Sequence, residues 1–198
     1  FFLGMLICIA GYVLFYIMIA FSQIYAKSAP TVSEAGYAMG LGFSPQIFTA
    51  LLMCSAISLA ITIAISGKYI DIIGRRIWLI WTTFSVAIFG LALPYFLDNG
   101  TTTSLFWFLM IGMGLIGMGY GPLASFLPEL FPTHARYSGA SLTYNISGLF
   151  GASVAAIITL PLNTNYGLKG VGIYLTLNAV LSLIGLWFII ETKDKHLA

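Results

Sequence analysis

Charged side chains are scarce in this sequence, and their scarcity excludes most classes of soluble protein. Of 198 residues, 7% are Asp, Glu, Lys or Arg, whereas 60% are hydrophobic. A soluble domain carries about 25% charged residues, so this chain could not cover a water-facing surface. A soluble enzyme, a disordered tail and a nucleic-acid-binding protein are therefore excluded, and the lipid bilayer is the expected solvent.

Cysteine and histidine are also rare, and their placement predicts no metal or cofactor site. Cys8 and Cys54 lie in apolar runs without metal-ligand spacing, where they are expected to be small buried hydrophobes. His134 and His196 fall outside the apolar runs, and the sequence has no His-x-x-x-His motif or catalytic-triad pattern. We therefore expect no catalytic residue, no metal and no cofactor, and an enzyme is the least favoured interpretation.

What the sequence does contain is six long apolar runs, each near the roughly 20 residues that a membrane helix needs. None of the eight basic and six acidic side chains falls inside a run, and the runs do not alternate as outer-membrane barrel strands do. The chain begins without an initiator Met, so we expect a piece of a longer protein. The predicted all-α membrane protein has helices at about 3–25, 46–66, 77–97, 105–127, 140–160 and 171–190.

The basic residues predict how these helices are oriented in the membrane. Six Lys and Arg lie on the side that carries the connections 66–77 and 128–139 and the C-terminal tail, whereas the other side has two, Lys27 and Lys169. Loops rich in Lys and Arg stay in the cytoplasm. We therefore expect a multi-pass protein of the plasma or bacterial inner membrane, with both termini of this segment in the cytoplasm.

Two connections carry motifs with a defined spacing. The first follows the second run and reads Gly67-x-x-x-Asp71-x-x-Gly74-Arg75-Arg76. The second follows the fourth run, at residues 128–140, and reads Pro-Glu-Leu-Phe-Pro-Thr-x-x-Arg-Tyr-Ser-Gly-Ala. Both resemble loops of the major facilitator superfamily, and the second is most similar to its metabolite:proton symporter branch.

This resemblance implies one half of a twelve-helix bundle, helices seven to twelve, with the amino-terminal six-helix half outside this sequence. It implies a secondary active transporter that moves a small polar metabolite (an organic acid, a sugar-like acid or an amino-acid-like solute) by alternating access, with the proton as coupling ion. No Asp, Glu, Lys, Arg or His lies at mid-membrane depth here, so the proton carrier would lie in the other half. The alternative is a membrane module or truncated half without transport activity, acting through a partner.

Charged residues at the predicted cytoplasmic helix ends form a candidate gating network. Ion pairs in partly desolvated surroundings can hold helix ends together in one conformation and break in another. By resemblance, such a network stabilises one state of a transporter; charges that only fix topology are the simpler alternative. The predicted network consists of Gly67, Asp71, Gly74, Arg75, Arg76, Glu129, Arg136 and Glu191.

Polar side chains in the first run indicate a face that is turned to the bundle interior. Tyr12, Tyr16 and Gln23 follow a helical spacing, and buried tyrosine hydroxyls need hydrogen-bond partners that lipid does not supply. In the superfamily, helices seven and ten line the substrate cavity, so the resemblance makes these residues cavity candidates. Contact with a neighbouring helix explains each of them equally well. The candidates in the fourth run are Trp107, Met110 and Met118.

Small residues recur in the fourth and fifth runs and predict close contacts between helices. In the fourth run they are the glycines at positions 112, 114, 117, 119 and 121. In the fifth run, Ser147, Gly148 and Gly151 belong to a similar stretch. Neither pattern needs a ligand to explain it.

Overall fold

The computed structural model describes residues 1–189 and is helical apart from the connections between helices. The first helix comprises α1 (Phe2–Tyr16), a π-helical turn (Ile17–Phe21) and α2 (Ser22–Lys27). It is followed by α3 (Pro45–Ile73), α4 (Arg75–Asp98) and α5 (Thr102–Glu129). After a 3₁₀ turn (Thr133–Ala135) come α6 (Arg136–Gly148), a second π-helical turn (Leu149–Ser153) and α7 (Val154–Phe188).

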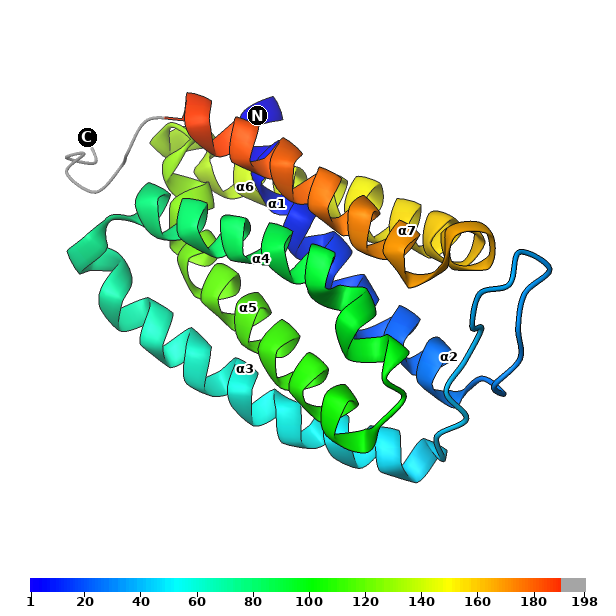
Figure 1. Cartoon of the computed structure of the whole chain (residues 1–198). Coiled ribbons are helices and arrows are strands. Elements are labelled where there is room, and N and C mark those ends of the chain that lie inside the picture. Colours follow the sequence, from blue (N-terminus) through cyan, green and yellow to red (C-terminus); the bar gives the residue numbers. More distant parts are fainter. Residues whose placement is uncertain (190–198) are drawn as a thin grey trace.

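Among the described residues, five helices are long and apolar enough to cross a membrane, against the six that the sequence predicted. The difference arises because the last two predicted runs fall in one 56-residue stretch, Thr133–Phe188. That stretch is two helices joined at Gly167, where φ is 65° and ψ is −167°. Glycine adopts this conformation without the steric cost of a Cβ atom, so a single residue replaces the predicted linker. Figure 1 shows the chain reversing direction in the orange segment.

A second glycine makes the turn between α3 and α4. The sequence placed residues 66–77 in a loop, but α3 continues through Ile73 and α4 begins at Arg75. Gly74 has a positive φ of 104°, and its N–H donates a hydrogen bond to the carbonyl of Ile70 at 2.9 Å. The motif that resembles a transporter loop is therefore mostly helical and changes direction at one residue.

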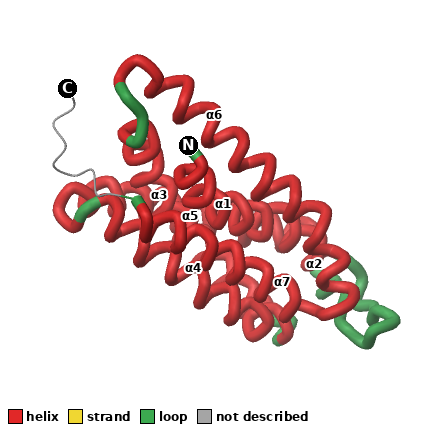
Figure 2. The backbone as a smooth tube through the Cα atoms, turned by 90° about the horizontal axis from the view of Figure 1, so that it is seen from above, coloured by secondary structure: helices red, strands yellow, loops and turns green. Residues whose placement is uncertain are grey.

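The helices form a bundle in which α3 packs on α5, and α4 packs on both α5 and α7 (Figures 1 and 2). Helix α1 contacts α7 and α6 and lies in the interior of the bundle. The α3–α4 junction and the N-terminus lie at one end of the bundle, which we call the Gly74 end. The connection 28–44 between α2 and α3 lies at the opposite end.

Close helix contacts occur where the sequence predicted them. A Cβ atom at Gly117 of α5 would lie 2.6 Å from the carbonyl oxygen of Leu59 on α3, a distance that real Cβ atoms do not adopt. At Gly151, a Cβ atom would lie 3.1 Å from the carbonyl oxygen of Ile9 on α1. The prediction of close packing by these small residues is confirmed.

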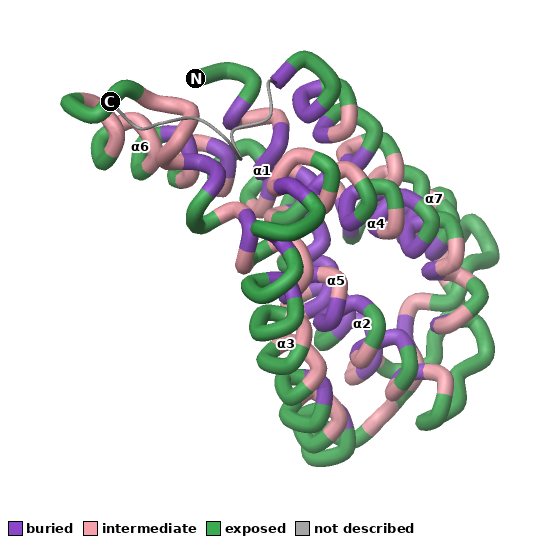
Figure 3. Tube along the Cα trace, turned by 90° about the vertical axis from the view of Figure 1, so that its left-hand side faces the viewer, coloured by how far each residue is buried: buried purple, intermediate pink, exposed green. Residues whose placement is uncertain are grey.

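Most of the residues of the main hydrophobic core belong to α1, α4, α5 and α7, and Figure 3 shows buried residues along these helices. Helix α3 differs from the others because most of its residues are exposed. Its large exposed side chains include Met53, Ile57 and Ile61. Such an apolar face is suited to lipid or to another membrane-embedded surface.

Candidate functional site

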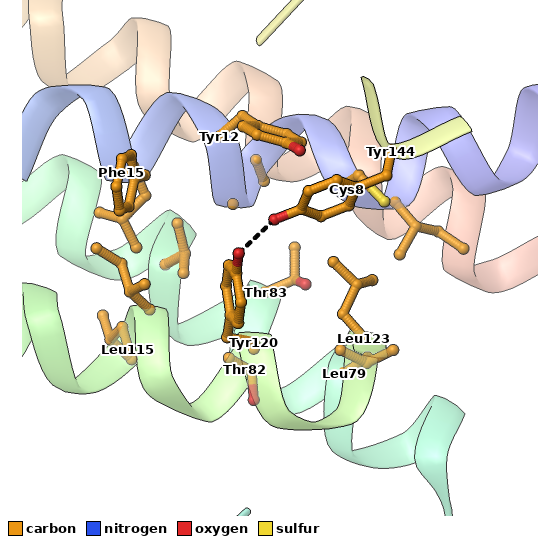
Figure 4. A pocket seen from close by; sticks show the side chains of 17 residues that line it. Cys8, Tyr12, Phe15, Leu79, Thr82, Thr83, Leu115, Tyr120, Leu123 and Tyr144 are labelled. Carbon is orange, nitrogen blue, oxygen red and sulfur yellow. Dashed lines mark hydrogen bonds between the residues drawn. The ribbon is translucent and has the colours of Figure 1, made fainter. Parts of the chain in front are cut away.

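A cavity of about 170 Å³ lies between α1, α4 and α5, with one residue of α6 at its wall (Figure 4). None of its lining residues, all of which belong to the described part of the chain, is charged. An apolar protein cavity of about 150 Å³ holds benzene, so this volume suits a small solute. Its polar or aromatic lining residues are Cys8, Tyr12, Phe15, Thr82, Thr83, Tyr120 and Tyr144.

Three tyrosines from three different helices meet at this cavity. The Tyr144 hydroxyl donates a hydrogen bond to the Tyr120 hydroxyl, with 2.6 Å between the oxygens. The Tyr144 ring lies 5.0 Å from the Tyr12 ring at 54°, and 6.4 Å from the Tyr120 ring at 86°. Gly148 provides the space for this arrangement, since a Cβ atom there would lie 3.2 Å from the Tyr12 ring.

A second and larger pocket, of about 700 Å³, lies between α5 and the start of α6. It is lined by Pro128, Arg136 and Tyr137, among others. Tyr120 and Tyr144 line both pockets. Their hydrogen bond therefore lies at the boundary between the cavity and a wider space that reaches towards the connection between α5 and α6.

Of the six predicted cavity residues, all of them described, Tyr12 alone lines the 170 Å³ cavity. Tyr16 packs against the hydrophobic core, and Gln23 is exposed. The π-helical turn at Ile17–Phe21 explains the position of Gln23, because one extra residue rotates everything after it by about 100°. The helical spacing from Tyr12 to Gln23 is therefore interrupted.

The three predicted residues of α5 do not line the cavity either. Trp107 is 52% exposed. The carbonyl of Met110 accepts a hydrogen bond from the Ser58 hydroxyl at 2.9 Å, and that of Met118 accepts one from the Trp78 indole at 2.9 Å. These residues hold α5 against α3 and α4.

The sequence analysis did not select Tyr144, Tyr120 or the two threonines of α4. Tyr144 lies near the start of the fifth apolar run, where a tyrosine is expected at the membrane interface, so its position did not mark it as a cavity residue. Thr82 could not be recognised, because a threonine in a membrane helix can bond its own backbone, as Thr82 does to the carbonyl of Trp78 at 3.0 Å.

Part of the predicted charge network is assembled at the Gly74 end. The Arg75 guanidinium forms ion pairs with Glu129 of α5 and with Asp71 of α3, the latter at 3.4 Å. The side chains of Arg75 and Glu129 are 20% and 15% exposed, whereas that of Asp71 is 71% exposed. The Arg75–Glu129 pair is therefore the partly desolvated one, and it connects α4 to α5.

Arg76 contacts a different helix from Arg75. Its Nε donates to the carbonyl of Leu186 at 2.9 Å and its Nη2 to the carbonyl of Trp187 at 2.8 Å. These carbonyls belong to the last turn of α7, where the helix leaves acceptors without intrahelical donors. Arg76 thus caps α7 and adds a favourable positive charge at the negative end of its dipole.

The remaining predicted network residues lie elsewhere. A Cβ atom at Gly67 would meet no described atom within 4 Å, because α3 exposes this face. Arg136 lines the second pocket, and its buried Nε has no hydrogen-bond partner among the described residues. Glu191 lies outside the described residues.

The sequence similarities place this helical bundle in a family of membrane transporters. The family described as Sugar (and other) transporter matches residues 37–198. The chain belongs to this family, which confirms the resemblance to the major facilitator superfamily. No solved structure matches the chain significantly.

Several curated proteins are similar over most of the chain. A Haemophilus influenzae protein named "Putative metabolite transport protein" is 90% identical over 100% of this chain and 44% of its own length. The Escherichia coli "Inner membrane metabolite transport protein YhjE" is 39% identical over 98% of this chain and 43% of its own length. The Dickeya dadantii "Glycine betaine/proline/ectoine/pipecolic acid transporter OusA" is 33% identical over 67% of this chain and 26% of its own length. The chain therefore spans about 44% of the length of the first of these relatives.

Proposed function

We propose that these residues are the carboxyl-terminal half, helices seven to twelve, of a proton-coupled secondary transporter in the bacterial inner membrane. The transporter moves a small polar metabolite by alternating access. The observation that carries this proposal is the uncharged cavity between α1, α4 and α5, bounded by the Tyr120–Tyr144 hydrogen bond. A relative named as an inner membrane protein supports the location.

Two observations support the assignment to one half of a larger bundle. The break at Gly167 divides the 56-residue stretch into two helices, so the chain crosses the membrane six times in this proposal. More than half of each similar protein lies outside the matched region. An amino-terminal six-helix half would cover exposed faces of the bundle and complete the walls of the substrate site.

The cavity favours one of the three substrate classes that the sequence left open. An organic acid or a sugar-like acid would bring a net negative charge into a cavity whose lining offers no basic side chain. Burying an unpaired charge is costly, whereas an amino-acid-like zwitterion is neutral overall. The name of the Dickeya dadantii relative, a transporter of betaine, proline and ectoine, also favours an amino-acid-like solute.

The lining also bears on proton coupling. A proton relay needs a titratable group within the membrane, and no Asp, Glu, Lys, Arg or His lines the described cavity. In this proposal, the proton carrier therefore belongs to the amino-terminal half. In this proposal, the ends of α4 and α5 separate in one of the two access states, and the ion pair of Arg75 and Glu129 biases the equilibrium between these states.

The test is uptake by proteoliposomes that contain the full-length transporter to which these residues belong. With an imposed inward proton gradient, we expect accumulation of a small amino-acid-like solute, and a protonophore should abolish it. Uptake by vesicles that contain these 198 residues alone would contradict the half-bundle assignment. Failure to move any solute of the three classes would instead support the alternative, a membrane module without transport activity.

A further inference from the structure

We propose that Tyr12, Tyr120 and Tyr144 form an aromatic cage that binds the positively charged, methylated ammonium end of a small zwitterionic solute. The transport of that solute rests on the proposed function, but its binding does not. The cage is defined by the three rings that line the 170 Å³ cavity and by the absence of charged residues among its described lining.

The electrostatics of the lining indicate how a cation could be held. A cation in a low-dielectric cavity needs either a carboxylate or the negative faces of aromatic rings. The described lining contains no carboxylate, but it contains three tyrosines and Phe15. Ring faces are therefore the groups in this cavity that can stabilise a positive charge.

The geometry of the rings suits this role (Figure 4). The planes of Tyr120 and Tyr144 are 86° apart, and that of Tyr12 is tilted by 54° from Tyr144. Because the ring planes are inclined to one another, a cation bound beside them can lie within about 6 Å of more than one ring centroid. Because each tyrosine comes from a different helix, the cage requires the tertiary contact of α1, α5 and α6.

The hydrogen bond within the cage leaves a donor for the anionic end of the same solute. Tyr144 donates its proton to the Tyr120 oxygen, so the Tyr120 hydroxyl retains its own proton for another acceptor. A solute carboxylate is the stronger acceptor for such a donor. The cage and this hydroxyl together can recognise both charges of a zwitterion.

The cavity lining has few free hydrogen-bond acceptors, and this favours a methylated ammonium over one that carries N–H groups. A free ammonium carries three N–H donors, and burying them without acceptors is costly. Among the lining residues, hydroxyls come from the tyrosines, Thr82 and Thr83, and the Thr82 hydroxyl already donates to the carbonyl of Trp78. A fully methylated ammonium has no N–H group, so the largely apolar cavity can accept it.

A pair of matched ligands tests the charge directly. Glycine betaine and 3,3-dimethylbutanoate have the same shape, but the first carries a trimethylammonium group where the second carries a neutral tert-butyl group. We expect the purified full-length protein to bind glycine betaine at least tenfold more tightly in equilibrium binding with labelled ligand. Equal affinity for the two compounds, or no binding of glycine betaine at millimolar concentration, would overturn the cage.

Variants test the rings separately from the hydroxyls. Tyr12→Leu and Tyr144→Leu should each weaken glycine betaine binding by about 2-fold to 30-fold, the range expected for one cation–π contact. Tyr12→Phe retains the ring and should bind nearly as well as the original protein. Tyr95→Leu is the matched control, because Tyr95 is 75% exposed on α4 and does not line the cavity. A loss of binding in Tyr12→Phe equal to that in Tyr12→Leu would argue against ring recognition.

Binding and uptake measured on the same protein separate this inference from the proposed function. Glycine betaine binding without uptake of any solute would support the cage and contradict transport. Proton-driven uptake of an acid or a sugar that glycine betaine does not inhibit would support transport and overturn the cage.

Discussion

Arg75, the first residue of α4, forms an ion pair with Glu129, the last residue of α5. Each charge is unfavourable at its own helix end, because the helix dipole places partial positive charge at the N-terminus and partial negative charge at the C-terminus. The attraction between the two charges compensates both unfavourable interactions with the helix dipoles. Removing one partner therefore leaves the other at an unfavourable helix end.

We predict that Glu129→Gln slows transport more than it lowers the amount of protein in the membrane. In the proposed mechanism, the ends of α4 and α5 separate in one of the two access states, so loss of the ion pair shifts the equilibrium between these states. Its coupling free energy should be about 1–3 kcal/mol, measured by a double-mutant cycle with Arg75→Gln. Asp71→Asn is the control, because an exposed pair contributes about 1 kcal/mol or less. Normal transport by Glu129→Gln would show that these charges serve only to fix the orientation of the helices in the membrane.

Arg76→Lys should loosen the end of α7 although it preserves the charge. A lysine cannot make the two directed contacts of the guanidinium to the carbonyls of Leu186 and Trp187. We expect a loss of about 1–2 kcal/mol in unfolding free energy and faster amide hydrogen exchange in the last turn of α7. Lys68→Arg, at an exposed position of α3, should change neither quantity. Unchanged amide hydrogen exchange in Arg76→Lys would show that the guanidinium contacts do not stabilise the last turn of α7.

Gly117→Ala should destabilise the contact between α3 and α5 by about 1–3 kcal/mol, as overpacking of a close interface does. The added methyl group would overlap the side chain of Thr62 and the carbonyl of Leu59. Gly11→Ala is the matched control, because a Cβ atom there meets nothing within 4 Å and alanine favours helix. Thermal unfolding in detergent would compare the two variants, and similar midpoints would contradict the packing.

Gly167→Ala should disturb the turn that divides the last helical stretch. A Cβ atom at this position would lie 2.6 Å from the ring of Tyr37, and a φ of 65° is itself unfavourable for alanine. The double variant Gly167→Ala with Tyr37→Ala removes the overlap but not the backbone strain. We therefore expect only partial recovery of unfolding free energy, and complete recovery would show that the backbone conformation is not strained.

Cysteine labelling should separate cavity residues from core residues of the same helix. In a background with Cys8→Ser and Cys54→Ser, cysteines at Tyr12 and Tyr120 should react with an impermeant thiol reagent, and substrate should protect them. Cysteines at Val13 and Met18 should not react, because both side chains are 0% exposed and neither lines the cavity. Equal labelling at all four positions, independent of substrate, would show that the cavity is not accessible.

The sequence by itself determined the class of this protein. Apolar runs of membrane-spanning length without internal charges leave the backbone no alternative to helices in lipid, so the all-α fold could be predicted from composition and spacing alone. The motif from Gly67 to Arg76 likewise identified the superfamily. The glycines of α5 predicted close packing because several of them recur along one helix, where the absence of side chains lets a neighbouring backbone approach.

The tertiary structure decided which of these residues meet. Glu129 lies far from Arg75 in the sequence, and only the packing of α5 beside α4 makes it the partner. The π-helical turn at Ile17–Phe21 moves Gln23 off the face of Tyr12, although the sequence shows no proline or glycine there. Tyr120 and Tyr144 line the cavity because α5 and α6 converge there with α1 and α4. Such contacts depend on the rotation and crossing of whole helices, which local spacing cannot specify.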